Sequence, residues 1–87
     1  MNLSANDGYD CFEHLIARLR TEGHGGVADK LDYLLHKVAW TTGSELLGEL
    51  GLQILGFQKN VPTTSAEVQQ LLASCMDIVR QVWPDIK

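Results

Sequence analysis

The sequence predicts an all-α fold, a compact four-helix bundle with antiparallel neighbours and short loops. In four segments the apolar residues recur every third or fourth position, which is the period of a helix with one buried face. Glycine, proline and polar residues separate these segments, and no strand-like alternation persists. We expect helices at about residues 8–22, 26–39, 43–57 and 64–83 of a single domain covering 1–87.

The first two helices are predicted from clear apolar stripes. The first stripe comprises Tyr9, Phe12, Leu15, Ile16 and Leu19, and the second comprises Val27, Leu31, Leu34, Leu35 and Val38. Asn6 or Asp7 is expected to cap the start of the first helix, because a short polar side chain can accept from free backbone N–H groups. Gly23 is expected to end it, since glycine accepts the left-handed conformation that follows many helices.

The stretch Thr41–Gly51 raises the question of a phosphate-binding loop, because Gly43 and Gly48 have the glycine spacing of a P-loop. Such a loop needs a lysine after the second glycine, and this chain has Glu49, whose carboxylate would repel phosphate. Thr42 and Glu45 instead have the spacing of a capping box. The stretch is therefore predicted to start a helix.

This third helix has an unusually wide apolar surface. Its only polar strip is Glu45, Glu49 and Gln53, and the apolar positions are Leu46, Leu47, Leu50, Leu52, Ile54, Leu55 and Phe57. Such a helix is expected to pack against more than one neighbour. Gly48 and Gly51 lie on the wide face, and each costs roughly 1 kcal/mol relative to alanine. We expect them to permit close approach of another helix.

Residues 58–63 break the pattern and are predicted to form a loop. Thr64 and Glu67 repeat the capping-box spacing at the start of the last helix. Its apolar stripe is Val68, Leu71, Leu72, Cys75, Val79, Val82 and Trp83, with Met76 and Ile78 on its flanks. Pro84 is expected to stop this helix.

Composition excludes several classes of partner. The chain has 87 residues, 45% of them hydrophobic and 21% charged, with a formal net charge of −4. An acidic chain is repelled by nucleic acid and by anionic membrane surfaces, and residues 41–58 contain no Lys or Arg to contact phosphates. No apolar run is long enough to span a bilayer. We therefore expect no nucleic-acid or membrane partner, and the charge suits a basic protein.

The cysteines and histidines offer little chemistry. Cys11 and His14 could form half of a metal site, but no second Cys/His pair completes it, so no metal or cofactor is expected. We expect Cys11 at the edge of the core, His14 in solvent, and Cys75 buried without a partner. Two reduced thiols and the absence of a secretory signal at the start of the chain favour a cytoplasmic protein. A metal- or thiol-dependent enzyme using Cys11 and His14 is the remote third hypothesis.

No motif identifies a family. In length, acidity and expected helix number the chain is similar to colicin-type DNase immunity proteins. It lacks their tyrosine-tyrosine-proline signature, so no residue role is transferred.

The leading hypothesis is a non-enzymatic protein that binds another protein, as a regulator, inhibitor or immunity-type factor. The candidate binding residues are Trp40, Asp29, Asp32, Glu45 and Glu49, with the carboxylates facing a basic partner and the indole as anchor. The alternative is a self-associating homodimer formed through the wide apolar face of the third helix, or through the first and last helices. For Trp40 and Trp83, closing an end of the core is the commoner role.

Overall fold

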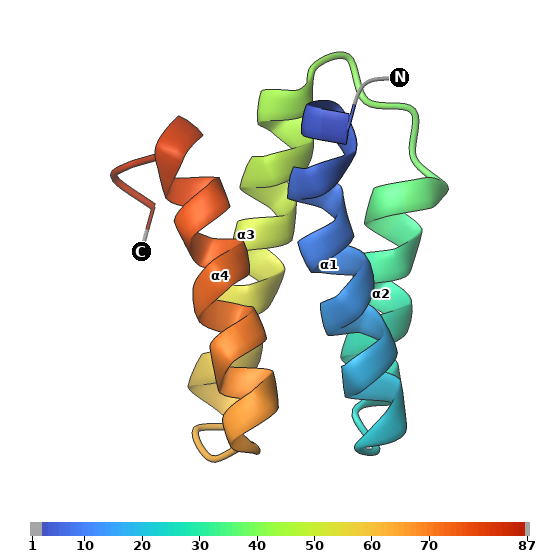
Figure 1. The fold of residues 1–87 in the computed structure, drawn as a ribbon, viewed down its shortest axis with the longest axis vertical. Coiled ribbons are helices and arrows are strands. Elements are labelled where there is room, and N and C mark those ends of the chain that lie inside the picture. The colour runs from blue at the N-terminus through green and yellow to red at the C-terminus, as the bar shows by residue number, and fades with distance from the viewer. Residues whose placement is uncertain (1–2, 87) are drawn as a thin grey trace.

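Over residues 3–86, four helices form a closed up-and-down bundle in which each helix is antiparallel to its neighbours (Figure 1). The computed structural model describes the backbone of residues 3–86 and the side chains from Tyr9 to Ile86. The helices are α1 (Leu3–Thr21), α2 (Gly25–His36), α3 (Gly43–Asn60) and α4 (Ala66–Val82). α1 packs against α2 and α4, and α3 packs against the same two helices. The predicted all-α four-helix bundle is confirmed.

The first two helices have different ends from those predicted. α1 begins at Leu3 rather than residue 8, so Asn6 and Asp7 lie inside the helix and the predicted cap there is wrong. A capping residue favours the start of a helix at its own position, but it does not prevent the helix from beginning earlier. Residues 3–8 contain no proline that would stop the helix from extending to Leu3.

α2 ends at His36 rather than residue 39, and the chain then folds back on the end of the helix. The Trp40 indole Nε1–H donates to the Leu34 carbonyl at 2.6 Å, and the Lys37 N–H donates to the Tyr33 carbonyl at 2.8 Å. These donors satisfy two of the carbonyls that a helix end leaves free.

The ends of α3 and the start of α4 are settled by local hydrogen bonds. The Thr42 hydroxyl accepts from the Glu45 N–H at 3.2 Å, as predicted. α3 continues to Asn60, so the loop predicted from residue 58 is wrong; the helical pattern runs on until Pro62 removes a donor. α4 begins after Ser65, whose hydroxyl accepts from the Val68 N–H at 3.2 Å. The predicted cap at Thr64 is therefore one residue too early.

Gly23 and Gly51 do what the sequence predicted of them. Gly23 has φ +87°, and the turn is closed by bonds from its N–H to the Arg20 carbonyl and from the His24 N–H to the Leu19 carbonyl. A Cβ at Gly51 would lie 2.7 Å from Val79 Cγ1, so this glycine lets α3 and α4 approach closely.

The core is continuous along the bundle. Its buried residues are Phe12, Leu15, Ile16, Leu19, Ala28, Leu31, Leu34, Leu46, Leu50, Ile54, Phe57, Val68, Leu72, Cys75, Met76 and Val79. Most positions of the four predicted stripes are among them.

Candidate functional site

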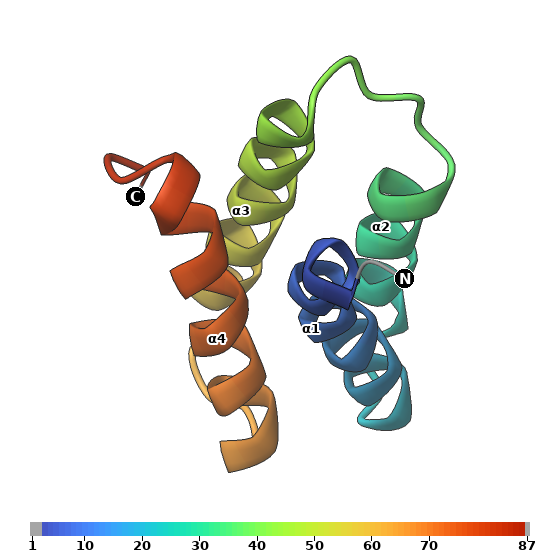
Figure 2. The ribbon, with the colours of Figure 1, turned by 45° about the horizontal axis from the view of Figure 1, so that its top comes forward.

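The two tryptophans line a groove at the end of the bundle where α3 begins. The groove has a volume of about 480 Å³. Its lining residues come from the α2–α3 connection, the first turns of α3 and the turn that follows α4: Trp40, Glu45, Gly48, Glu49, Leu52, Trp83, Asp85 and Ile86. We call these eight residues the tryptophan groove. Figure 2 shows the α2–α3 connection and the C-terminal turn at the same end of α3.

Both indoles are fixed by hydrogen bonds to backbone carbonyls. Trp40 Nε1–H donates to Leu34 at 2.6 Å, and Trp83 Nε1–H donates to Ser44 at 2.7 Å. Their polar atoms are thus satisfied within the chain, and the rings can offer their apolar surface to a ligand. Gly48 makes room for one of them, because a Cβ there would lie 3.2 Å from Trp83 Nε1.

The groove carries apolar surface that the bundle leaves uncovered. The Leu52 side chain is 54% exposed and Trp83 is 44% exposed, and Val82 beside it is also exposed. Ile86 is folded back toward α3 by a bond from its N–H to the Trp83 carbonyl at 3.1 Å. Neighbouring exposed apolar side chains of this size are typical of interaction sites, whereas a single exposed leucine is not.

The charges around the groove have one sign. Among the described residues that line it, Glu45, Glu49 and Asp85 carry carboxylates and none is Lys or Arg. All three are exposed, and none of them forms an ion pair with a described side chain of residues 9–86. The groove therefore has a negative rim with no neutralising partner among the side chains of residues 9–86.

The structure brings together some of the predicted binding residues and separates others. Trp40, Glu45 and Glu49 line the tryptophan groove. Asp29 and Asp32 do not line it; they lie on α2 beside Arg20, whose Nη2 is 2.8 Å from Asp29 Oδ1 and 3.7 Å from Asp32 Oδ2. The five predicted residues thus do not share one surface.

Sequence reasoning missed the other half of the groove. It counted Leu52 on the wide apolar face of the third helix and Trp83 in the stripe of the last helix without placing them beside Trp40, and it assigned no role to Asp85 or Ile86. The helical period puts Leu52 on an apolar face but does not show that the neighbouring helices leave this position open. Pro84 was a usable signal, since a proline after a helix allows the chain to turn back.

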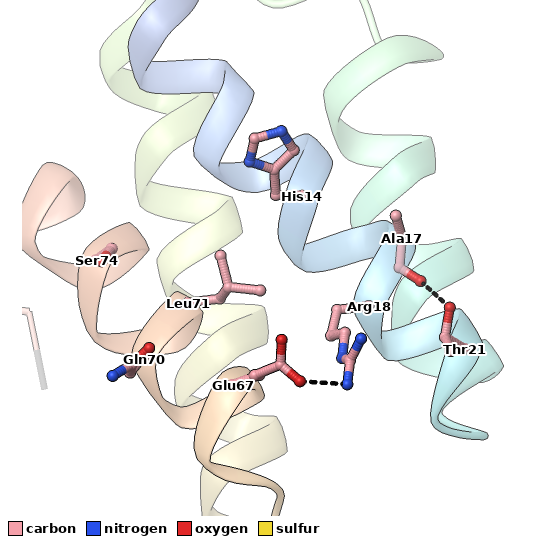
Figure 3. A pocket seen from close by; sticks show the side chains of 8 residues that line it. All are labelled: His14, Ala17, Arg18, Thr21, Glu67, Gln70, Leu71 and Ser74. Atoms are coloured by element: carbon pink, nitrogen blue, oxygen red, sulfur yellow. Dashed lines mark hydrogen bonds and ion pairs between the residues drawn. The ribbon is translucent and has the colours of Figure 1, made fainter.

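A second groove lies between α1 and α4 and has a volume of about 540 Å³ (Figure 3). Arg18 extends across it from α1 to Glu67 on α4, and its Nε also donates to Glu22 Oε2 at 2.7 Å. The Ser65 hydroxyl donates to the same Glu22 oxygen at 2.9 Å. This groove is larger than the tryptophan groove, but its charges already pair with one another. We therefore regard it as a solvated seam between helices.

The pairing affects the ionisation of Glu22. The hydrogen bond from Ser65, followed by the contact with Arg18, lowers the pKa of the Glu22 carboxyl against the opposing effect of burial. Glu22 thus serves as an acceptor that joins the first and third connections of the bundle.

The two cysteines lie side by side, which the sequence did not indicate. Cys11 Sγ on α1 is 3.1 Å from Cys75 Sγ on α4, and both are free thiols. Cys75 is fully buried, and this burial, with the hydrogen bond to Cys11, raises the pKa of its thiol. Cys11 is partly buried and His14 is exposed in the seam, as predicted. No hydrogen bond joins Cys11 to His14 in the described part of the chain.

Among the described side chains of residues 9–86, no three His, Cys, Asp or Glu residues lie so that they could hold a metal ion. Within residues 3–86, no helix has the length and hydrophobicity to cross a bilayer.

Comparison with known proteins found no matching family model, no similar curated protein and no similar solved structure.

Proposed function

We propose that this chain is a non-enzymatic protein-binding module whose tryptophan groove takes a basic amphipathic helix of another protein. The observation that carries the proposal is a groove that combines exposed apolar side chains, two anchored indoles and three carboxylates without an ion-pair partner among the described side chains. Apolar anchors beside aromatic residues supply most of the affinity of small interfaces, and charges around them select the partner.

The spacing of the carboxylates suggests the form of the partner. Glu45 and Glu49 lie one turn apart on α3, so two Lys or Arg residues one turn apart on a helix would match them. An apolar side chain between Trp83 and Leu52 would complete the contact. A volume of about 480 Å³ accommodates a few side chains, so the interface is small and the complex is expected to be transient.

The arrangement of the thiols and imidazoles gives less support to an enzyme. A nucleophilic cysteine needs a base within hydrogen-bond distance, and Cys11 contacts Cys75 and the Leu71 carbonyl instead. We therefore propose that the chain acts by binding another protein, as a regulator, inhibitor or immunity-type factor.

A designed peptide pair tests the proposal. The probe is a synthetic amphipathic helix of leucine and lysine, and the control replaces each lysine by glutamate. Tryptophan fluorescence is followed as each peptide is added. We expect saturable binding of the lysine peptide that weakens with added salt, and no binding of the glutamate peptide.

Matched variants locate the binding site. Leu52→Asp should weaken binding of the lysine peptide by about tenfold or more, because it places a charge on the apolar floor. Tyr33→Asp changes an equally exposed side chain outside the groove and should have little effect. Equal losses in the two variants would contradict the proposal. Sedimentation could instead show a dimer that is lost in Leu52→Asp. The occupant of the groove would then be a second copy of this chain and not a basic helix of another protein.

A further inference from the structure

The contact between Cys11 and Cys75 plays no part in the binding proposed for the tryptophan groove. The cysteines are separated by 64 positions in the sequence, and the packing of α1 on α4 brings their sulfur atoms to 3.1 Å. At this distance the two sulfur atoms touch directly, and they are about 1 Å further apart than in a disulfide bond. We propose that Cys11 and Cys75 form a dithiol that hydrogen peroxide converts to a reversible disulfide joining α1 to α4.

The surroundings of the two thiols assign them different roles. Cys11 is partly exposed and stands one turn before His14, which lines the seam between α1 and α4 (Figure 3). Its Sγ is also 4.0 Å from the carbonyl oxygen of Leu71, another residue of that seam. Since Cys11 is partly exposed and Cys75 is fully buried, a small oxidant from solvent reaches Cys11 first.

The ionisation of Cys75 supports this order. Burial raises the pKa of its thiol, so Cys75 stays protonated and is a poor first nucleophile toward peroxide. It remains well placed for the second step, because its sulfur already contacts that of Cys11.

The reaction balances with peroxide as the oxidant. The Cys11 thiolate attacks one oxygen of hydrogen peroxide, the O–O bond breaks, and the released hydroxide takes up a proton to leave as water. Cys11 is then a sulfenic acid. The Cys75 sulfur attacks the Cys11 sulfur, the S–O bond breaks, and the thiol proton of Cys75 leaves with the hydroxyl as a second water. Two thiols are oxidised to one disulfide, and one peroxide is reduced to two waters.

The experiment uses the full chain, reduced and folded, treated with hydrogen peroxide and analysed by intact mass. We expect a monomer lighter by about 2 Da, with the Cys11 and Cys75 peptides linked in a non-reducing digest. Dithiothreitol should restore the original mass. Because the disulfide closes a long loop, the oxidised protein should melt several degrees or more above the reduced one.

Two variants separate the roles of the thiols. In Cys75→Ser, peroxide should add oxygen to Cys11 without forming the intramolecular bond, because the resolving thiol is missing. In Cys11→Ser, the buried Cys75 should resist peroxide in the folded protein and react after unfolding in urea.

The proposal is overturned if the folded wild-type chain keeps both thiols under peroxide while the urea-unfolded chain forms the disulfide. It is also overturned if oxidation yields mainly disulfide-linked dimers or oxygen adducts. These readouts need no binding partner, so their failure leaves the proposed function of the groove standing.

Discussion

The two ends of the bundle are built differently. At the end that carries the α1–α2 and α3–α4 connections, Arg18, Glu22, Ser65 and Glu67 form one network of hydrogen bonds and ion pairs, and His24 packs edge-on against Phe57 with ring centroids 5.2 Å apart. We call this the closed end. The opposite end, which carries the α2–α3 connection and the C-terminal turn, is the open end with the tryptophan groove (Figure 1).

The difference lies in what each end does with its carboxylates and apolar side chains. At the closed end, the Arg18 guanidinium pairs with Glu22 one turn further along the chain and with Glu67 on α4. At the open end, Glu45, Glu49 and Asp85 have no ion-pair partner among the side chains of residues 9–86 and surround exposed apolar surface. Because unused charge and apolar surface add little to stability, we infer that the closed end serves folding and the open end serves binding.

The largest effect expected from this comparison concerns one substitution made at each end. Leu19→Ala at the closed end removes a fully buried side chain and should lower the free energy of unfolding by about 2–5 kcal/mol. Leu52→Ala removes the same atoms from a residue that is 54% exposed. It should therefore lower the free energy of unfolding by less than about 1 kcal/mol. Urea denaturation followed by circular dichroism measures both.

The peptide titration supplies the other half of this comparison. Leu52→Ala should weaken binding of the lysine peptide. Leu19→Met, a milder substitution at the closed end, should leave this binding unchanged. If Leu52→Ala destabilises the fold as much as Leu19→Ala, the open end is part of the core and the comparison fails.

At the closed end, the turn and the buried stripe depend on residues close in sequence, whereas its contacts between helices, like the whole open end, depend on distant residues. The turn at Gly23 follows from one glycine after an apolar stripe, and the stripe itself predicts the burial of Leu19. In contrast, the position of Trp83 depends on Gly48 and Ser44, which lie on another helix.

The same limit applies to the thiols and the carboxylates. The period of α4 predicts that Cys75 is buried, but only the packing of α1 on α4 shows that Cys11 is its neighbour. Likewise, sequence spacing places Asp29 and Glu45 on polar faces of their helices, yet it cannot show that Arg20 pairs with Asp29 and that nothing in the described chain pairs with Glu45.

A moderate effect on stability is expected from Ser65, whose hydroxyl makes two hydrogen bonds at the closed end. Its hydroxyl accepts from the Val68 N–H as the cap of α4 and donates to Glu22. Ser65→Ala removes both bonds and should lower the free energy of unfolding by about 1 kcal/mol. The matched variant is Thr42→Ala at the open end, which removes a cap with no second bond to a carboxylate. Urea denaturation at neutral pH compares them.

The pH dependence distinguishes the two caps. The pKa of Glu22 is lowered in the folded state, first by Ser65, so the folded chain binds fewer protons than the unfolded chain as Glu22 titrates. The stabilisation by Glu22 is therefore complete above the unfolded pKa and is lost as the pH falls through the folded pKa. Ser65→Ala should reduce this acid-dependent loss, and Thr42→Ala should leave it unchanged. Parallel pH profiles in the two variants would show that Ser65 acts only as a helix cap.

The smallest expected effect concerns Gly48, under the Trp83 indole. Alanine gains about 1 kcal/mol over glycine in a helix interior, but here its Cβ would lie 3.2 Å from Trp83 Nε1 and push the ring away from the Ser44 carbonyl. Losing that hydrogen bond costs about 1 kcal/mol, so the stability of Gly48→Ala should change little. The control is Gly56→Ala on the same helix, where a Cβ meets no atom within 4 Å and the full gain should appear.

Fluorescence shows whether the indole has moved. In a Trp40→Phe background, the emission of Trp83 should shift to longer wavelength in Gly48→Ala, because the displaced ring is more exposed to water, and should stay unchanged in Gly56→Ala. Equal stabilisation by the two alanines with no spectral shift would mean that Trp83 does not rest on α3. The apolar floor of the tryptophan groove would then lack the fixed indole on which its fit to an apolar side chain depends.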